Sequence, residues 1–152
     1  MAKKIGVISD THSLLRDEVK GRLAGCDRII HAGDVGSAAV LTELQQIAEV
    51  VVVRGNVDTG AWAVGLPPEE YWEVEGHRIY VVHDLSACAL DPAGAGIDIV
   101  IHGHSHRPGI VHQDGILYLN PGSAGPKRFH LPVSMAFLRI EAAAISPEMV
   151  VL

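Results

Sequence analysis

The chain has 152 residues and a formal net charge of −6, with 48% hydrophobic and 20% charged residues. This balance is typical of a globular protein and excludes a disordered one. The acidic charge, without any basic run, excludes a non-specific nucleic-acid binder, and no stretch approaches the roughly 18 apolar residues that span a bilayer. We therefore predict a single domain over residues 1–152 and no membrane partner.

The two cysteines and the first residues of the chain indicate the cellular compartment of the protein. Cys26 and Cys88 lie far apart and form no CxxC motif, so we expect small buried side chains in a reducing environment. Residues 1–6 contain no extended apolar segment and no cleavage motif. We expect no signal peptide and a cytoplasmic protein.

The first 54 residues alternate between strand and helix patterns. Runs rich in Val and Ile predict strands at residues 4–9, 28–31 and 50–54. Apolar residues at helical spacing predict helices at about 14–24 and 37–48, the second with Ser37 as N-cap. This β-α-β-α-β order predicts parallel strands joined by right-handed crossovers.

The remainder of the chain is richer in hairpin signals. Glu75-Gly76-His77 and Gln113-Asp114-Gly115 predict tight turns. We expect this part to be antiparallel, and its predicted strands cover residues 71–75, 78–83, 98–102, 109–113, 116–120, 133–141 and 148–152. Together the two parts predict an α/β fold of two packed mixed β-sheets flanked by helices, an α-β-β-α sandwich.

Potential metal ligands follow five of the predicted strands. Ligands of α/β proteins bind beyond the carboxyl ends of the strands, so these side chains are expected to converge on one edge. Glycines beside them, at 33, 55 and 103, allow sharp turns or close approach. The side chains are Asp10, His12, Asp34, Asn56, His83, His104 and His106.

These residues form an ordered set of motifs. They are Asp10-Thr-His12, Gly33-Asp34, Gly55-Asn56-Val57-Asp58, an isolated His83, and Gly103-His104-Ser105-His106. In this order they resemble the calcineurin-like metallophosphoesterase family. The short chain and the segment Asn120-Pro-Gly-Ser123 most resemble the small prokaryotic phosphodiesterases of that family. The resemblance covers most of the chain.

The resemblance implies a centre of two divalent metal ions. One ion would be held by Asp10, His12 and His106, the other by Asn56, His83 and His104, with Asp34 bridging both. Asp34, Asn56 and His104 are also assigned catalytic roles. The nitrogen and oxygen donors suit Mn²⁺, which we expect first, and equally Fe, Zn²⁺, Ni²⁺ or Co²⁺.

The function implied is phosphodiester hydrolysis on a small substrate, by in-line attack of a metal-bridging hydroxide on phosphorus. A first alternative is a non-catalytic scaffold or binding module that retains the fold. The retromer subunit of this fold resembles such a module and lacks part of the metal set. A second alternative is a metal-dependent hydrolase of other esters.

Two positions depart from the family pattern. Val57 stands where many members have a histidine thought to protonate the leaving group, and a valine cannot transfer a proton. We therefore expect weaker activity on esters with poor leaving groups. Asp84 follows His83 where relatives often have glycine. It could orient a metal-binding histidine or alter substrate access.

Other residues have plainer interpretations. His31 and His102 lie on strands and are interpreted as core or supporting histidines, and Asp58 as a turn carboxylate. Segment 120–123 is read as a structural turn, with phosphate contact as the alternative. Lys127 and Arg128 are either solvated or meet substrate anions. Aromatic segment 62–72 indicates local packing, a wall for a substrate base, or the interface of a homo-oligomer.

Overall fold

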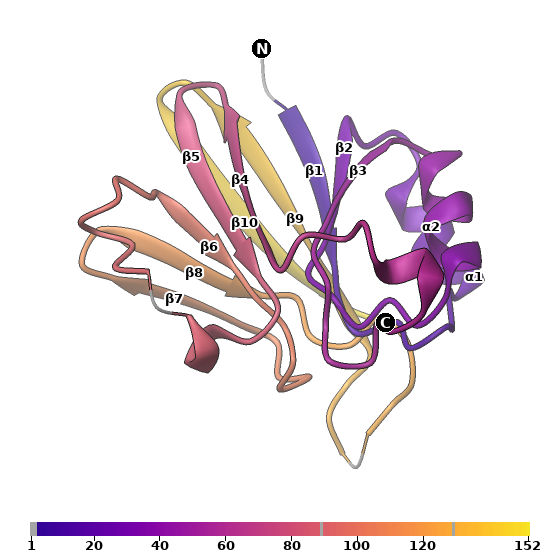
Figure 1. The fold of residues 1–152 in the computed structure, drawn as a ribbon. Coiled ribbons are helices and arrows are strands. Elements are labelled where there is room, and N and C mark those ends of the chain that lie inside the picture. The colour runs from indigo at the N-terminus through magenta and orange to yellow at the C-terminus, as the bar shows by residue number, and fades with distance from the viewer. Residues whose placement is uncertain (1–2, 89, 129) are drawn as a thin grey trace.

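The computed structural model describes residues 3–88, 90–128 and 130–152 and contains two five-stranded sheets that pack face to face (Figure 1). Their strand orders are β10-β9-β1-β2-β3 and β4-β5-β6-β8-β7. The elements are β1 (Lys3–Ile8), α1 (Asp17–Leu23), β2 (Arg28–His31), α2 (Ala38–Gln45), β3 (Glu49–Val52), η1 (Ala61–Ala63), β4 (Glu69–Val74), β5 (His77–Val82), η2 (Leu85–Ala87), β6 (Ile99–Ile101), β7 (Gly109–Gln113), β8 (Ile116–Asn120), β9 (Ser134–Glu141) and β10 (Ala144–Val151).

The first sheet is built around the parallel strands predicted from the first 54 residues. β1 pairs with β2, and β2 with β3, both in parallel register. The hairpin of β9 and β10 extends the other side of β1 in antiparallel register. Helices α1 and α2 cover the outer face of this sheet (Figure 1), where Val19, Leu23, Val40 and Leu44 join its apolar side chains in one buried cluster.

Both helices are shorter than the sequence predicts. α1 begins at Asp17, because the loop before it is bound to the loop after β2, where the Ser13 N–H donates to the Val35 carbonyl. Ser37 occupies the N-cap position of α2, as predicted, although its side chain makes no capping hydrogen bond. Among the described residues, no helix has the length and apolar character needed to cross a membrane.

The second sheet is mixed, which corrects the antiparallel expectation for this half. β4 pairs with β5 and β7 with β8 in antiparallel register, but β5, β6 and β8 are parallel neighbours. A parallel pair needs a crossover of about a dozen residues or more. The connection between β5 and β6 supplies it, and its described residues, 83–88 and 90–98, contain no α-helix. Helical periodicity therefore gave no signal there.

Three apolar layers hold the sheets together. The cluster between the sheets includes Ile5, Val7, Ile79 and Leu138, all fully buried. α1 and α2 cover the first sheet, whereas the crossover containing η2 covers the outer face of the second, around Tyr80. The two mixed sheets are thus confirmed, with α-helices of the described residues on one outer face only.

The hairpins follow the local sequence closely. Glu75 and Gly76 have positive φ (49° and 81°), as do Asp114 and Gly115 (54° and 77°). Positive φ at both central residues is the type I′ geometry that favours two-residue hairpins. β10 begins at Ala144, earlier than predicted; it tolerates Pro147 because it is an edge strand.

Candidate metal centre

The predicted ligands meet where strands of both sheets end. Asp10 and His12 follow β1 and Asp34 follows β2 of the first sheet, whereas His83 follows β5, and His104 and His106 follow β6, of the second. They form two groups whose ligand atoms lie within 4.8 Å of one another: Asp10 with His12 and His106, and Asp34 with His83 and His104.

Asp34 lies between the two groups. Its Oδ2 atom is 3.5 Å from His12 Nε2 in the first group and 3.2 Å from His83 Nε2 in the second. Asp10 Oδ1 is close to both as well, 3.5 Å from His106 Nε2 and 3.9 Å from His83 Nε2. A carboxylate in the position of Asp34 could bind an ion in either group, as its predicted bridging role requires.

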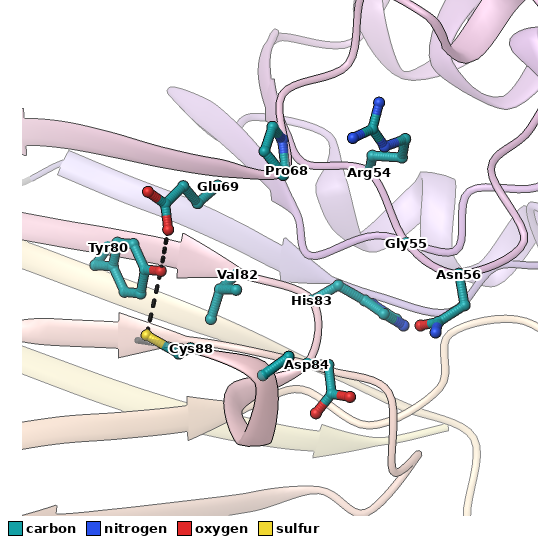
Figure 2. A pocket seen from close by; sticks show the side chains of 11 residues that line it. Arg54, Gly55, Asn56, Pro68, Glu69, Tyr80, Val82, His83, Asp84 and Cys88 are labelled. Atoms are coloured by element: carbon teal, nitrogen blue, oxygen red, sulfur yellow. Dashed lines mark hydrogen bonds between the residues drawn. The ribbon is translucent and has the colours of Figure 1, made fainter. Parts of the chain in front are cut away.

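Asn56 stands at the edge of the second group. Figure 2 shows its amide and the His83 imidazole pointing toward one another across the mouth of a cavity of about 420 Å³. Asn56, His83 and Asp84 line the metal side of this cavity, and Glu69, Tyr80 and Cys88 line its far end. We call this cavity the side pocket.

In Asp10 and in Asp34, one carboxylate oxygen accepts hydrogen bonds from the protein and the other faces the histidines. Asp10 Oδ2 accepts hydrogen bonds from Ser9 Oγ (2.8 Å) and the His104 N–H (3.2 Å). Asp34 Oδ1 accepts from the Val57 N–H (3.0 Å). These bonds fix both carboxylates with Oδ1 of Asp10 and Oδ2 of Asp34 facing the histidines. Ligands held this way by their surroundings are typical of metal sites.

The orientation of His83 follows the same rule. Its Nδ1 atom lies 2.8 Å from the Ala32 carbonyl oxygen, so Nδ1 carries the proton and Nε2 presents a lone pair to Asp34 and the site. The neighbouring Gly33, with φ of 101°, leaves room for the ring, since a Cβ there would lie 2.7 Å from His83 Nδ1.

Four buried polar atoms have no hydrogen-bond partner among the described residues: Asp10 Oδ1, His12 Nε2, His83 Nε2 and His106 Nδ1. All four belong to predicted ligands. Unsatisfied buried polar atoms are costly and rare in folded proteins. Two of these nitrogens, His12 Nε2 and His83 Nε2, lie 3.8 Å and 3.9 Å from Asp10 Oδ1. This cluster of buried lone pairs from both sheets fits a divalent cation.

The electrostatics of the site favour added positive charge. Burial opposes ionisation of Asp34, but His83, the Val57 N–H and His12 outweigh it and hold the pKa of Asp34 below its ordinary value. Burial likewise opposes protonation of His83, yet the Asp34 and Asp10 carboxylates raise its pKa. Asp34 thus remains ionised and stabilises a cation beside it.

The backbone of the site adopts strained conformations that the sequence did not signal. Asp10, His12, Asp34, His104 and His106 all have positive φ, between 45° and 71°. Such conformations are uncommon outside glycine and cluster at functional sites. The only hint in the sequence was the repeated pairing of these residues with glycine.

Residues interpreted as supporting lie outside the two groups. His31 is fully buried; its Nδ1 accepts from the Gly33 N–H (3.1 Å) and its Nε2 lies 2.9 Å from Thr11 Oγ1. Asp58 accepts three backbone N–H bonds, from Val35, Gly36 and Gly55. His102 belongs to neither group. His31 and Asp58 therefore brace the loops, as predicted.

Segment 120–123 is a structural brace. Asn120 Nδ2 donates to the Gly103 carbonyl (3.3 Å) and Ser105 Oγ (3.1 Å), which fixes the loop that carries His104 and His106. Ser123 Oγ donates to the Asp10 carbonyl (3.1 Å). Asn120 and Ser123 are both buried, so the structural interpretation holds over phosphate contact.

The two departures from the family pattern lie at the rim. The Val57 side chain is 46% exposed, next to Asn56, where it offers no proton. Asp84 Oδ1 accepts from the Ser86 N–H (3.0 Å) and Ser86 Oγ (2.7 Å), which caps η2. Its Oδ2 lies 3.8 Å from His104 Nε2. Asp84 is therefore placed to orient His104.

The aromatic segment 62–72 and the basic pair Lys127 and Arg128 also had predicted roles. Trp62 and Trp72 pack against the two main apolar clusters, Tyr71 is 45% exposed, and Pro68 lines the side pocket. Lys127 and Arg128 are exposed. Burial lowers the pKa of His106, the Asp10 carboxylate opposes this shift, and the positive charge of Arg128 adds to it.

Comparison with known proteins agrees with this geometry. The calcineurin-like phosphoesterase superfamily domain matches residues 4–143, so the chain belongs to this family. A probable metallophosphoesterase of Methanothermobacter thermautotrophicus is 33% identical over 96% of this chain and 91% of its own. A phosphodiesterase of Methanocaldococcus jannaschii is 28% identical, over 78% of this chain and 82% of its own. The fold is also that of Vps29 from Entamoeba histolytica, solved with Zn²⁺, with a TM-score of 0.78 and 23% identity over 97% of this chain and 98% of that one.

Proposed function

We propose that the protein is a dinuclear metal-dependent phosphodiesterase. The observation that carries the proposal is the position of Asp34, within 3.5 Å of a histidine of each ligand group. One ion would be held by Asp10, His12 and His106, the other by Asn56, His83 and His104, with Asp34 shared. When bound, two divalent ions lower the pKa of water and hold the oxygens of a phosphoryl group during in-line displacement.

The residues of the chain supply the rest of the chemistry. Asp10 and Asp34 provide two negative charges against the cations, while neutral histidines and Asn56 add none, so the loaded centre keeps positive charge for an anionic phosphodiester. Asn56 and His104 are exposed and can reach the phosphate oxygens of a bound substrate. Val57 provides no general acid, so diesters with good leaving groups are the preferred substrates.

The relatives support this choice of substrate and of metal. Similar chains from archaea carry the names metallophosphoesterase and phosphodiesterase, and Zn²⁺ has been seen in a protein of the same fold. Mn²⁺ suits the nitrogen and oxygen donors as well, and we propose it as the working metal. The two unpaired cysteines, Cys26 and Cys88, support a reducing cytoplasm as the compartment.

The test is hydrolysis of bis(p-nitrophenyl) phosphate by the metal-stripped protein with added Mn²⁺. We expect turnover that requires the ion and falls at least about 100-fold in Asp34→Asn. Asp17→Asn is the matched control, because the Asp17 carboxylate is fully exposed on α1. Mn²⁺ binding without turnover of any diester would contradict the proposal.

A binding module is the second candidate, because the chain shares its fold with Vps29. The complete set of ligands argues against this candidate, since four of their buried atoms have no hydrogen-bond partner among the described residues. A protein that binds Mn²⁺ but hydrolyses no ester would be such a module. Turnover of carboxylic esters alone would instead indicate a hydrolase of another class.

A further inference from the structure

The side pocket adjoins the metal centre and has chemistry that the metal centre does not use. Asn56, His83 and Asp84 form its near wall, so a substrate on the centre has one substituent facing it. Its volume of about 420 Å³ falls in the lower part of the range of small-molecule sites, roughly 300–1,000 Å³. It therefore suits one compact group rather than a polymer.

A carboxylate stands at the far end of the side pocket. The hydroxyl of Tyr80 donates to Glu69 Oε2, and Cys88 Sγ lies 3.3 Å from the same hydroxyl (Figure 2). Tyr80 lies in the wall of the side pocket but has no exposed surface, so a ligand meets the exposed Glu69 before the Tyr80 ring. Tyr80 is accordingly a positioning residue, and Glu69 Oε1 is left to accept from a ligand.

The protonation of the Tyr80 phenol is fixed by its surroundings. Burial raises the pKa of Tyr80, and Cys88 and Glu69 raise it further, so the phenol keeps its proton and donates. Glu69 then presents a negative charge held by a rigid, buried partner. An acceptor of this kind selects for hydroxyl or amine donors.

The charges around the side pocket exclude an anionic occupant. Glu69 and Asp84 are negative and Arg54 is positive, which leaves one excess negative charge among the lining residues outside the metal centre. The rest of the lining is apolar, with Pro68, Val82 and Ala87. This combination suits a small uncharged or cationic group that has carbon faces and donor groups.

We propose that the side pocket binds the ester group that stays on phosphorus, and that Glu69 selects a hydroxyl- or amine-bearing group, such as a polyol or a sugar, over an anionic one. The proposal rests on the proposed phosphodiesterase function. In-line displacement expels the leaving group opposite the nucleophile. A pocket that shares its wall with the metal ligands lies beside the phosphate, and so faces the retained group.

The test uses three p-nitrophenyl phosphodiesters that differ only in the second ester: 2,3-dihydroxypropyl, propyl and 2-carboxyethyl. All release the same leaving group, so differences in kcat/KM report the retained group. For the wild type we expect the highest value with dihydroxypropyl and the lowest with carboxyethyl. Glu69→Gln should lower the dihydroxypropyl value by roughly 5–10-fold, leave propyl unchanged and raise carboxyethyl.

Two further variants distinguish substrate selection by Glu69 from a general structural effect of the substitution. Glu73→Gln removes a carboxylate from the same face of β4 outside the side pocket, and should leave all three values unchanged. Tyr80→Phe should lower the preference for dihydroxypropyl over propyl, because Glu69 loses its donor. Equal changes for all three diesters in Glu69→Gln, or the same effect in Glu73→Gln, would overturn the proposal.

A binding measurement keeps the two proposals separable. Glycerol phosphate and propyl phosphate are titrated calorimetrically into the Mn²⁺-loaded protein, which requires no turnover. Tighter binding of glycerol phosphate that disappears in Glu69→Gln supports the side pocket even if no diester is cleaved, in which case only the proposed function fails. Turnover without any preference, together with equal binding, overturns the side-pocket proposal alone.

Discussion

Asp34 and His83 approach to 3.2 Å between Oδ2 and Nε2, although they follow strands of two different sheets. Asp34 comes after β2, and His83 comes after β5 of the facing sheet. The contact closes the edge of the sandwich at the point where both ligand groups meet. The centre therefore depends on how the two sheets pack, and substitutions that shift either loop should affect metal binding.

Replacement of Val57 should restore a general acid. Val57 is 46% exposed beside Asn56, so Val57→His has room for an imidazole at the rim. We expect roughly 100-fold faster cleavage of diesters with poor leaving groups and little change for p-nitrophenyl esters. The measurement is the dependence of kcat/KM on leaving-group pKa. An unchanged slope would show that a proton donor at position 57 does not reach the leaving oxygen.

Asp84 should tune metal binding through His104. Asp84→Asn keeps an acceptor for the Ser86 N–H and removes the charge 3.8 Å from His104 Nε2. We expect Mn²⁺ affinity to fall by roughly 10-fold, as for other residues that orient metal ligands. Ser86→Ala is the control, since it removes the Ser86 Oγ bond and leaves the carboxylate. Equal affinity in wild type and Asp84→Asn would remove this role.

Gly55 should tolerate no side chain. A Cβ at position 55 would collide with the backbone nitrogen and Oδ1 of Asp34, and neither can move without displacing the centre. We expect Gly55→Ala to lower the free energy of unfolding by about 3 kcal/mol and to weaken Mn²⁺ binding. Gly109→Ala, where a Cβ meets open space, should stay within about 0.5 kcal/mol of wild type in urea titrations.

The metal-free protein should lose stability in mild acid through His31. Complete burial lowers the pKa of His31 from 6.5 to about 4. Between pH 6.5 and 4, His31 binds a proton in the unfolded chain but not in the folded chain. The contribution of neutral His31 to the free energy of unfolding is therefore complete above pH 6.5 and is lost as the pH falls toward 4. It amounts to about 3 kcal/mol. His31→Gln should show a correspondingly flatter pH dependence of the urea midpoint; parallel curves would refute this.

The sequence predicted which candidate ligands lie together better than it predicted the fold around them. Asp10, Asp34 and His104 could be placed because each follows a strand rich in Val or Ile, and strand ends converge. The parallel pairing of β5, β6 and β8 was missed, because their connections are irregular loops that leave no periodic pattern.

The side pocket was beyond sequence reasoning for a different reason. Glu69 and Tyr80 lie on neighbouring antiparallel strands but are not directly paired in register, since Tyr80 pairs with Tyr71 and Glu69 with Val82. Their contact depends on the length and burial of the Tyr80 side chain and on the crossover that brings Cys88 to it. Neither is visible in composition or spacing.

The central claim is that the two ligand groups share Asp34 in one centre. It is tested most directly by titrating the metal-stripped protein with Mn²⁺ and following the bound ions by electron paramagnetic resonance. We expect two ions per chain whose spectrum shows magnetic coupling, as for metals about 3.5–4 Å apart. A single bound ion at saturation, or two ions without coupling, would contradict it.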